Sequence, residues 1–152
     1  MTRSVLVVED EPVIAWLVEE ALRCQGYDVL SFGTADAAVD CLSDLHYWCH
    51  VLVTDVRLPG ELNGWSLARF ARERFPSLQV IYLTGDSMLS WSAEKVDNSL
   101  IFQKPFVVSS LVAAVGRFPL REQDLETATQ NHLLHDTRNE TSQYRAQPGD
   151  YN

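Results

Sequence analysis

Hydrophobic positions in the first 118 residues alternate between two patterns. Short runs of β-forming residues recur at 5–8, 27–31, 51–53, 80–83 and 100–102, and the most continuous of them are typical of strands buried on both faces of a sheet. After each run, apolar residues recur at helical spacing, which predicts helices over 12–24, 35–45, 64–75, 87–96 and 107–118. The fourth helix is the weakest prediction because serine and tryptophan replace strong helix formers there.

The regular alternation of strands and helices predicts the fold class. It indicates an α/β protein of (βα)5 type, with a doubly wound, parallel five-stranded sheet and helices on both faces. Within it, Ala38, Leu42 and Leu45 are expected to share one face of the second helix. Ligands of such sheets bind outside the carboxyl ends of the strands. The residues that end or follow each strand are therefore the candidates for function.

Side chains with useful chemistry follow four of the five predicted strands. They are Glu9, Asp10 and Glu11 after the first, Asp55 after the third, Thr84 after the fourth and Lys104 after the fifth. Clustered carboxylates resist ionising together unless a cation is present, and an all-oxygen ligand set suits Mg²⁺ rather than zinc. A carboxylate beside Mg²⁺, with an ammonium and a hydroxyl nearby, favours in-line phosphoryl transfer to the carboxylate oxygen.

Four motifs, in this order and spacing, resemble the receiver domain of bacterial two-component response regulators over residues 4–118. They are Val5-Leu6-Val7-Val8-Glu9-Asp10-Glu11-Pro12, Thr54-Asp55-Val56-Arg57-Leu58-Pro59-Gly60, Leu83-Thr84-Gly85 and Lys104-Pro105-Phe106. The resemblance implies a flavodoxin/CheY-like sheet with strand order 2-1-3-4-5. It also implies a cis peptide bond between Lys104 and Pro105.

The resemblance assigns chemical roles to three matching side chains. Asp55 corresponds to the phospho-acceptor, which takes a phosphoryl group from a phosphohistidine of a sensor histidine kinase or a phosphotransfer protein. Lys104 corresponds to the lysine that pairs with the acyl phosphate. Thr84 corresponds to the hydroxyl that turns toward the phosphoryl group as a switch.

The resemblance also implies a Mg²⁺ cofactor. Asp10 corresponds to the acid that ligates the metal directly, and Glu9 to its neighbour, which acts through water. Asp55 and the main-chain carbonyl of Arg57 complete the implied ligand set. Glu11 falls beyond the matched acidic pair, so we interpret it only as an acid at a helix N-terminus, where the helix dipole favours it.

One departure from the family pattern bears on the output. Ile101 stands where the family usually has Tyr or Phe, three residues before the lysine. The leading hypothesis is a stand-alone response regulator that signals through phosphorylation-dependent protein–protein contacts, and a phosphate sink or non-switching adaptor is the alternative. A phosphatase with Asp55 as nucleophile is disfavoured because Arg57 stands where haloacid-dehalogenase-type phosphatases carry a second Asp. We expect no enzyme activity beyond the chain's own phosphorylation and autodephosphorylation.

Composition narrows the classes of partner. The chain of 152 residues has 12 Lys and Arg against 21 Asp and Glu, a formal net charge of −9. This balance disfavours nucleic acid and anionic membranes as partners. No apolar run approaches the ~20 residues of a membrane span, and neither a signal peptide nor a C-x-x-C pair is present. We therefore expect a cytoplasmic protein.

The composition changes near residue 119. We predict a receiver domain over 1–118 and a polar, acidic tail over 119–152 that is mostly disordered, with a short helix near 122–134 compatible with its pattern. Such a tail is too small for a DNA-binding or enzymatic output domain. The expected output is contact with an unidentified downstream protein. A homodimer through the fourth helix, fifth strand and fifth helix is the arrangement that relatives suggest.

Several other side chains have a structural explanation beside a functional one. Trp65 is interpreted as a packing residue, whereas Trp91 and Met88 fit either the core or an exposed partner contact. The segment before the third strand contains two imidazoles and a thiol, those of His46, His50 and Cys49. A zinc site is disfavoured there because these side chains do not make a set of four ligands.

Overall fold

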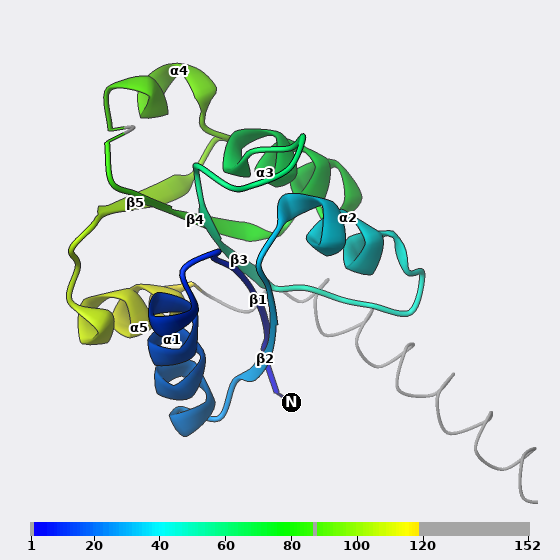
Figure 1. Ribbon diagram of the computed structural model, residues 1–152. Helices are drawn as coiled ribbons and strands as arrows, with labels where there is room; N and C mark the ends of the chain where they lie inside the picture. The colour runs from blue at the N-terminus through cyan, green and yellow to red at the C-terminus, as the bar shows by residue number, and fades with distance from the viewer. Residues whose placement is uncertain (1, 87, 119–152) are drawn as a thin grey trace, which may run out of the picture. The chain divides into compact units, whose positions relative to one another are not determined.

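The computed structural model describes residues 2–86 and 88–118 and has the predicted alternation of strands and helices (Figure 1). The strands are β1 Ser4–Val8, β2 Asp28–Phe32, β3 Val51–Asp55, β4 Gln79–Thr84 and β5 Ser99–Gln103. The helices are α1 Pro12–Cys24, α2 Ala35–Ser43, α3 Gly64–Arg74, the 3-10 helix η1 Met88–Ser90, α4 Trp91–Glu94 and α5 Val108–Arg117.

The C-terminal tail and the possibility of a membrane span were also considered from the sequence. The predicted tail over 119–152, with its helix near 122–134, lies outside the described residues. Among the helices of the described residues, none has the length and apolar character needed to cross a membrane.

The five strands form one parallel sheet in the order β2-β1-β3-β4-β5, which confirms the predicted fold class and strand order. All five residues of β3 are buried, as expected of an interior strand covered on both faces. One face of the sheet packs against α1 and α5, and the other against α2 and α3 (Figure 1). The strand order reverses between β1 and β3, so the carboxyl ends of these two strands flank the point where ligands are expected.

Helix α2 ends two residues before its predicted end. Asp44 follows the helix with an extended backbone (φ −65°, ψ 123°), and its Oδ1 accepts the His46 backbone N–H at 2.9 Å. Such a local side-chain bond competes with continuation of a helix. The prediction that Leu45 shares a helical face with Ala38 and Leu42 was therefore wrong, because Leu45 lies beyond the helix, and its side chain is 76% exposed.

The segment between β4 and β5 differs most from its predicted form. Instead of one helix over 87–96, it has the three-residue η1 and the four-residue α4. Neighbouring elements tie it down, because Val96 N–H donates to Tyr82 Oη at 3.2 Å and Arg72 Nη1 donates to the Asp97 carbonyl at 2.9 Å. The weak helix formers of this segment thus leave its shape to hydrogen bonds from β4 and α3.

Two of the tryptophans have a clear place in the packing. Trp65 is 6% exposed and its ring lies 4.6 Å from that of Tyr82, which confirms its packing role. Trp91 is partly buried against the core between the sheet and α3, and Lys95 Nζ lies 3.8 Å from its ring centroid. Trp91 is therefore a core contact. The Met88 side chain lies outside the described part of the structure.

Polar side chains also gather at the amino ends of the strands, opposite the expected site. Ser4 N–H donates to His50 Nδ1 at 3.0 Å, and Ser4 Oγ lies 3.3 Å from Tyr47 Oη. The buried Cys49 Sγ donates to the Val51 carbonyl at 3.2 Å. The side chains of His50 and Cys49, which were considered as zinc ligands, therefore hold the local backbone together.

Candidate active site

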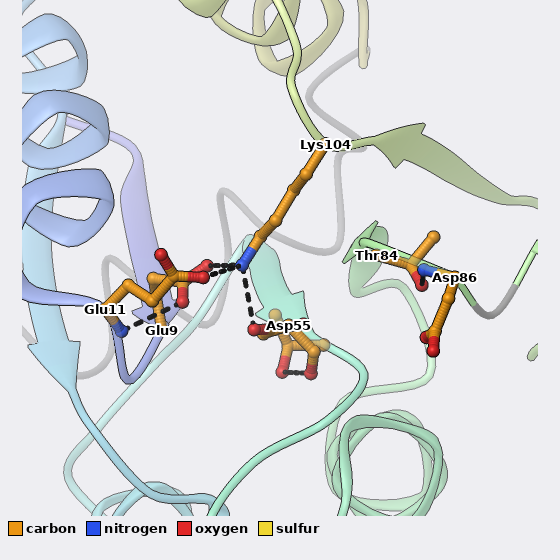
Figure 2. Close-up of polar contacts among 7 residues, drawn as sticks. Glu9, Glu11, Asp55, Thr84, Asp86 and Lys104 are labelled. Carbon is orange, nitrogen blue, oxygen red and sulfur yellow. Dashed lines mark hydrogen bonds and ion pairs between the residues drawn. The ribbon is translucent and has the colours of Figure 1, made fainter.

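The candidate site lies at the carboxyl ends of the strands, where the topology brings four segments together (Figure 2). Asp55 is the last residue of β3 and Thr84 the last of β4, while Glu9 follows β1 directly and Lys104 follows β5. The Thr54 hydroxyl donates to the Asp55 carbonyl at 2.9 Å, and Lys104 N–H donates to the Thr84 carbonyl at 2.7 Å. These bonds anchor the backbone from which the site side chains extend.

Lys104 is the centre of the charged cluster. Its Nζ lies 2.8 Å from Glu9 Oε2, 2.9 Å from Asp55 Oδ2 and 3.2 Å from Glu11 Oε1 (Figure 2). The lysine and the first two carboxylates are largely shielded from solvent, and the Glu9 side chain is completely buried. The Lys104–Pro105 peptide bond is cis, as the resemblance implied. The cluster therefore carries three carboxylates against one ammonium.

Burial and the nearby lysine have opposite effects on the pKa values of the carboxyl groups in this cluster. Burial raises the pKa of Glu9 to about 7, although hydrogen bonds from Lys104 and Glu11 N–H oppose the change. Burial also raises the pKa of Asp55, against the effect of Lys104, and the negative charge of Asp10 adds to the rise. Burial alone disfavours the ammonium of Lys104, yet its bonds to Glu9 and Asp55 raise its pKa above the ordinary value. One lysine does not fully compensate the buried carboxylates.

The arrangement fits a hard divalent cation. Carboxylate oxygens of Glu9, Glu11 and Asp55 all lie within 4.8 Å of one another. Three oxygen donors of this type are the ligands that Mg²⁺ prefers, and an added cation would offset the burial that raises the pKa values of Glu9 and Asp55. The residues present therefore fit the implied metal.

Asp10 and Glu11 lie differently from their predicted places. Asp10 is exposed and is not a member of this oxygen cluster, so its role as a direct metal ligand stays a prediction. Glu11 was interpreted only as a helix-terminal acid, and that interpretation was wrong. It occupies the N-cap position of α1 but makes no side-chain capping bond, and its carboxylate reaches Lys104 instead. Pro12 restricts the preceding residue to the extended backbone seen at Glu11 (φ −81°, ψ 111°).

Thr84 and Arg57 meet at a residue that the sequence did not single out. The Thr84 Oγ1 accepts the backbone N–H of Asp86 at 3.3 Å (Figure 2). Arg57 Nη2 lies 2.8 Å from Asp86 Oδ2, and both side chains are more than half exposed. Asp86 thus joins the loop after β3 to the loop after β4. No motif or spacing marked Asp86, and only its place two residues after Thr84 offered a signal.

Ile101 is partly buried on the sheet face that packs against α3. Across the β4–β5 pair it lies opposite Tyr82, a fully buried aromatic residue on the same face. The Tyr82 hydroxyl accepts Val96 N–H at 3.2 Å, just beyond α4. Of these two paired strands, β4 rather than β5 therefore carries an aromatic ring on this face, two residues before Thr84.

Comparisons with known proteins agree with this geometry. The family described as the response regulator receiver domain matches residues 5–116. A response regulator receiver protein from Sinorhizobium medicae has a similar structure, with a TM-score of 0.74, 29% identity, and coverage of 77% of this chain and 94% of that one.

Two relatives differ in the share of their own length that this chain matches. The transcriptional regulatory protein AruR of Pseudomonas aeruginosa is 39% identical over 88 residues, which cover 56% of this chain and 35% of AruR. The response regulator receiver protein CpdR of Brucella abortus is 28% identical over 117 residues, which cover 76% of this chain and 95% of CpdR. The match thus spans about a third of AruR and almost all of CpdR.

Proposed function

Because this chain belongs to the response regulator receiver family, we propose that Asp55 accepts a phosphoryl group from a phosphohistidine of a sensor histidine kinase or a phosphotransfer protein. One observation carries the proposal. The Asp55 carboxylate ends an interior strand and lies 2.9 Å from the ammonium of Lys104, beside the buried carboxylate of Glu9. A nucleophilic oxygen, a cation and a carboxylate cluster suited to a metal therefore share one sheet edge.

The reaction needs little covalent chemistry from the protein. A carboxylate oxygen of Asp55 forms a bond to phosphorus while the bond from phosphorus to the imidazole nitrogen breaks, and that nitrogen keeps the electron pair. The product is an acyl phosphate on Asp55. Lys104 is close enough to stabilise negative charge on the transferred group, which is the main contribution that proteins make to phosphoryl transfer.

Mg²⁺ would be held by Glu9 and Asp55, together with Asp10 and the main-chain carbonyl of Arg57 that the family resemblance implies. When bound, the metal supplies positive charge against the phosphoryl oxygens. Glu11 adds a third carboxylate in this structure and holds the solvent side of Lys104.

The phosphoryl donor must reach this site, and apolar side chains are exposed on the segments that follow Glu11 and Lys104. Val13 and Trp16 on α1 are 69% and 60% exposed, and Val107, three residues after Lys104, is 64% exposed. Exposed apolar groups beside a charged centre favour a protein partner. The donor protein is expected to contact these residues while its phosphohistidine faces Asp55.

The output in this proposal is a contact with an unidentified downstream protein. CpdR, which the chain matches over nearly its whole length, offers a precedent for a receiver without a large output domain. A homodimer through α4, β5 and α5 remains part of the proposal. The chain catalyses only its own phosphorylation and autodephosphorylation, and no separate enzyme activity is assigned to it.

A phosphate sink is the second candidate, and Ile101 favours it. With no aromatic ring at position 101, the ring movement associated with the switch hydroxyl in the family is unavailable at that position. NMR chemical shifts of the protein with and without beryllofluoride distinguish the two functions. A sink predicts unchanged signals from α4 and β5, whereas a switch predicts changes in both.

The acceptor assignment is tested by phosphorylation of the full chain with acetyl phosphate and Mg²⁺. Intact-mass analysis should show one added phosphoryl group on the wild type and none on Asp55→Asn. Asp40→Asn, which changes an exposed carboxylate on α2, is the matched control and should be labelled like the wild type. Labelling of Asp55→Asn would contradict the proposal.

A further inference from the structure

An ion pair crosses between the two loops that leave the site from neighbouring strands. β3 and β4 pair in parallel with Asp55 opposite Leu83, so the chain leaves them side by side. Two residues beyond Asp55 and two residues beyond Thr84, Arg57 Nη2 and Asp86 Oδ2 lie 2.8 Å apart. The pair therefore joins the two segments that follow Asp55 and Thr84, and neither of its residues is among the ion-pair partners of Lys104.

Asp86 contacts both Arg57 and Thr84. Its side chain binds the Arg57 guanidinium. Its backbone N–H donates to Thr84 Oγ1 at 3.3 Å, as Figure 2 shows. Asp86 therefore connects Arg57 to Thr84, the last residue of β4. The short η1 and α4 follow directly and have few helical hydrogen bonds of their own.

We propose that Arg57 is a ligand for the phosphoryl group on Asp55, and that Asp86 withholds it in the unphosphorylated protein. This inference rests on the proposed function of Asp55. The Arg57 side chain is 78% exposed, so it can turn without disturbing the core. A guanidinium binds phosphate oxygens through paired hydrogen bonds, whereas an exposed ion pair changes an equilibrium by no more than about fivefold. The phosphoryl group therefore competes successfully with Asp86 for Arg57.

Transfer of Arg57 links phosphorylation to the loop after β4. Once Arg57 binds the phosphoryl oxygens, the contact between its guanidinium and the Asp86 carboxylate is lost. The loop that Asp86 shares with Thr84 then loses this ion pair with the loop after β3. This route involves neither Ile101 nor any ring movement on β5.

The test is a titration of the full-length protein with beryllofluoride at saturating Mg²⁺. Asp86→Asn should lower the half-saturating concentration about threefold, because Arg57 no longer has to leave an ion pair. Arg57→Gln should raise it about tenfold through loss of a charged hydrogen bond, while the main-chain carbonyl at this position is kept. The double variant should behave as Arg57→Gln alone.

Glu19→Gln is the matched control, because it removes an exposed arginine's carboxylate partner, 2.9 Å from Arg23, on α1. It should leave the titration unchanged. The inference is overturned if Asp86→Asn has no effect, or if its gain persists in the Arg57→Gln background. Failure of the proposed function looks different, since the wild type would then bind beryllofluoride no better than Asp55→Asn.

Discussion

The two edges of the sheet use polar side chains in opposite ways. At the amino ends of the strands, Ser4 makes neutral hydrogen bonds to His50 and Tyr47, which satisfy polar groups with no net charge. At the carboxyl ends, Lys104 faces three carboxylates, two of them buried. Neutral hydrogen bonds of this kind stabilise the fold, whereas an edge with excess buried negative charge favours binding of a cation.

The largest expected effect comes from removing the only ammonium of the charged edge cluster. Lys104→Met leaves Glu9 and Asp55 buried without their partner, so it should destabilise the protein by about 3 kcal/mol at pH 8. Phosphorylation by acetyl phosphate should slow at least ~100-fold because charge stabilisation is lost. Urea unfolding and intact-mass time courses measure the two effects.

Lys95→Met is the control for that substitution. It removes a lysine that lies over the Trp91 ring, far in sequence from the carboxylates, and should cost no more than about 1 kcal/mol. Equal losses in the two variants would mean that the carboxylate cluster has no special need of Lys104.

A smaller effect concerns the pH dependence of stability without Mg²⁺. Burial raises the pKa of Glu9 from 4.5 to about 7, so the folded protein holds a proton in this window that the unfolded chain releases. The stability from this group is therefore fully present below pH 4.5 and is lost as the pH rises through about 7. Glu9→Gln should remove this part of the pH slope and be about 1 kcal/mol more stable than the wild type at pH 8.

Urea titrations from pH 4.5 to 8 check this prediction, with Glu20→Gln on α1 as a control that keeps the slope. An identical slope in Glu9→Gln and the wild type would show that Glu9 does not titrate in that window.

The smallest effect tests the neutral edge. Tyr47→Phe removes the hydroxyl that lies 3.3 Å from Ser4 Oγ and should cost about 1 kcal/mol of stability. The rate of Asp55 phosphorylation should stay the same, because the hydroxyl lies at the opposite edge from the acceptor. A changed rate would mean that the two edges are coupled, which contradicts the separation described above.

Much of the fold and the heart of the site followed from local patterns. Buried strands are recognised in the sequence as runs of aliphatic residues. A parallel topology places the carboxyl ends of neighbouring strands together, independently of the loop conformations. Asp55, Thr84 and Lys104 end or follow such strands, so their proximity was predictable before any contact was known. The structure also confirmed the strand order and the cis bond after Lys104, which the family resemblance had implied.

Other features depended on competition between alternative contacts, several of them between residues distant in the chain. Glu11 gives up helix capping for an ion pair with Lys104, 93 residues away. Leu45 lies outside α2 because Asp44 binds the backbone of His46. The segment after β4 takes its shape from Tyr82 and α3 rather than from its own propensity. Local propensity cannot rank such alternatives, since their energies differ by about 1 kcal/mol or less.

By itself, the sequence determined that this chain forms a parallel α/β sheet with the Asp55 carboxylate and the Lys104 ammonium at the carboxyl ends of its strands. Hydrophobic period and strand topology suffice for that, because they act over every residue of each element. Only the tertiary structure decided that Glu11 joins the cluster and that Asp86 binds both Arg57 and Thr84. These features depend on single contacts between loops. Such a contact can form only when the whole fold has brought its two residues close together.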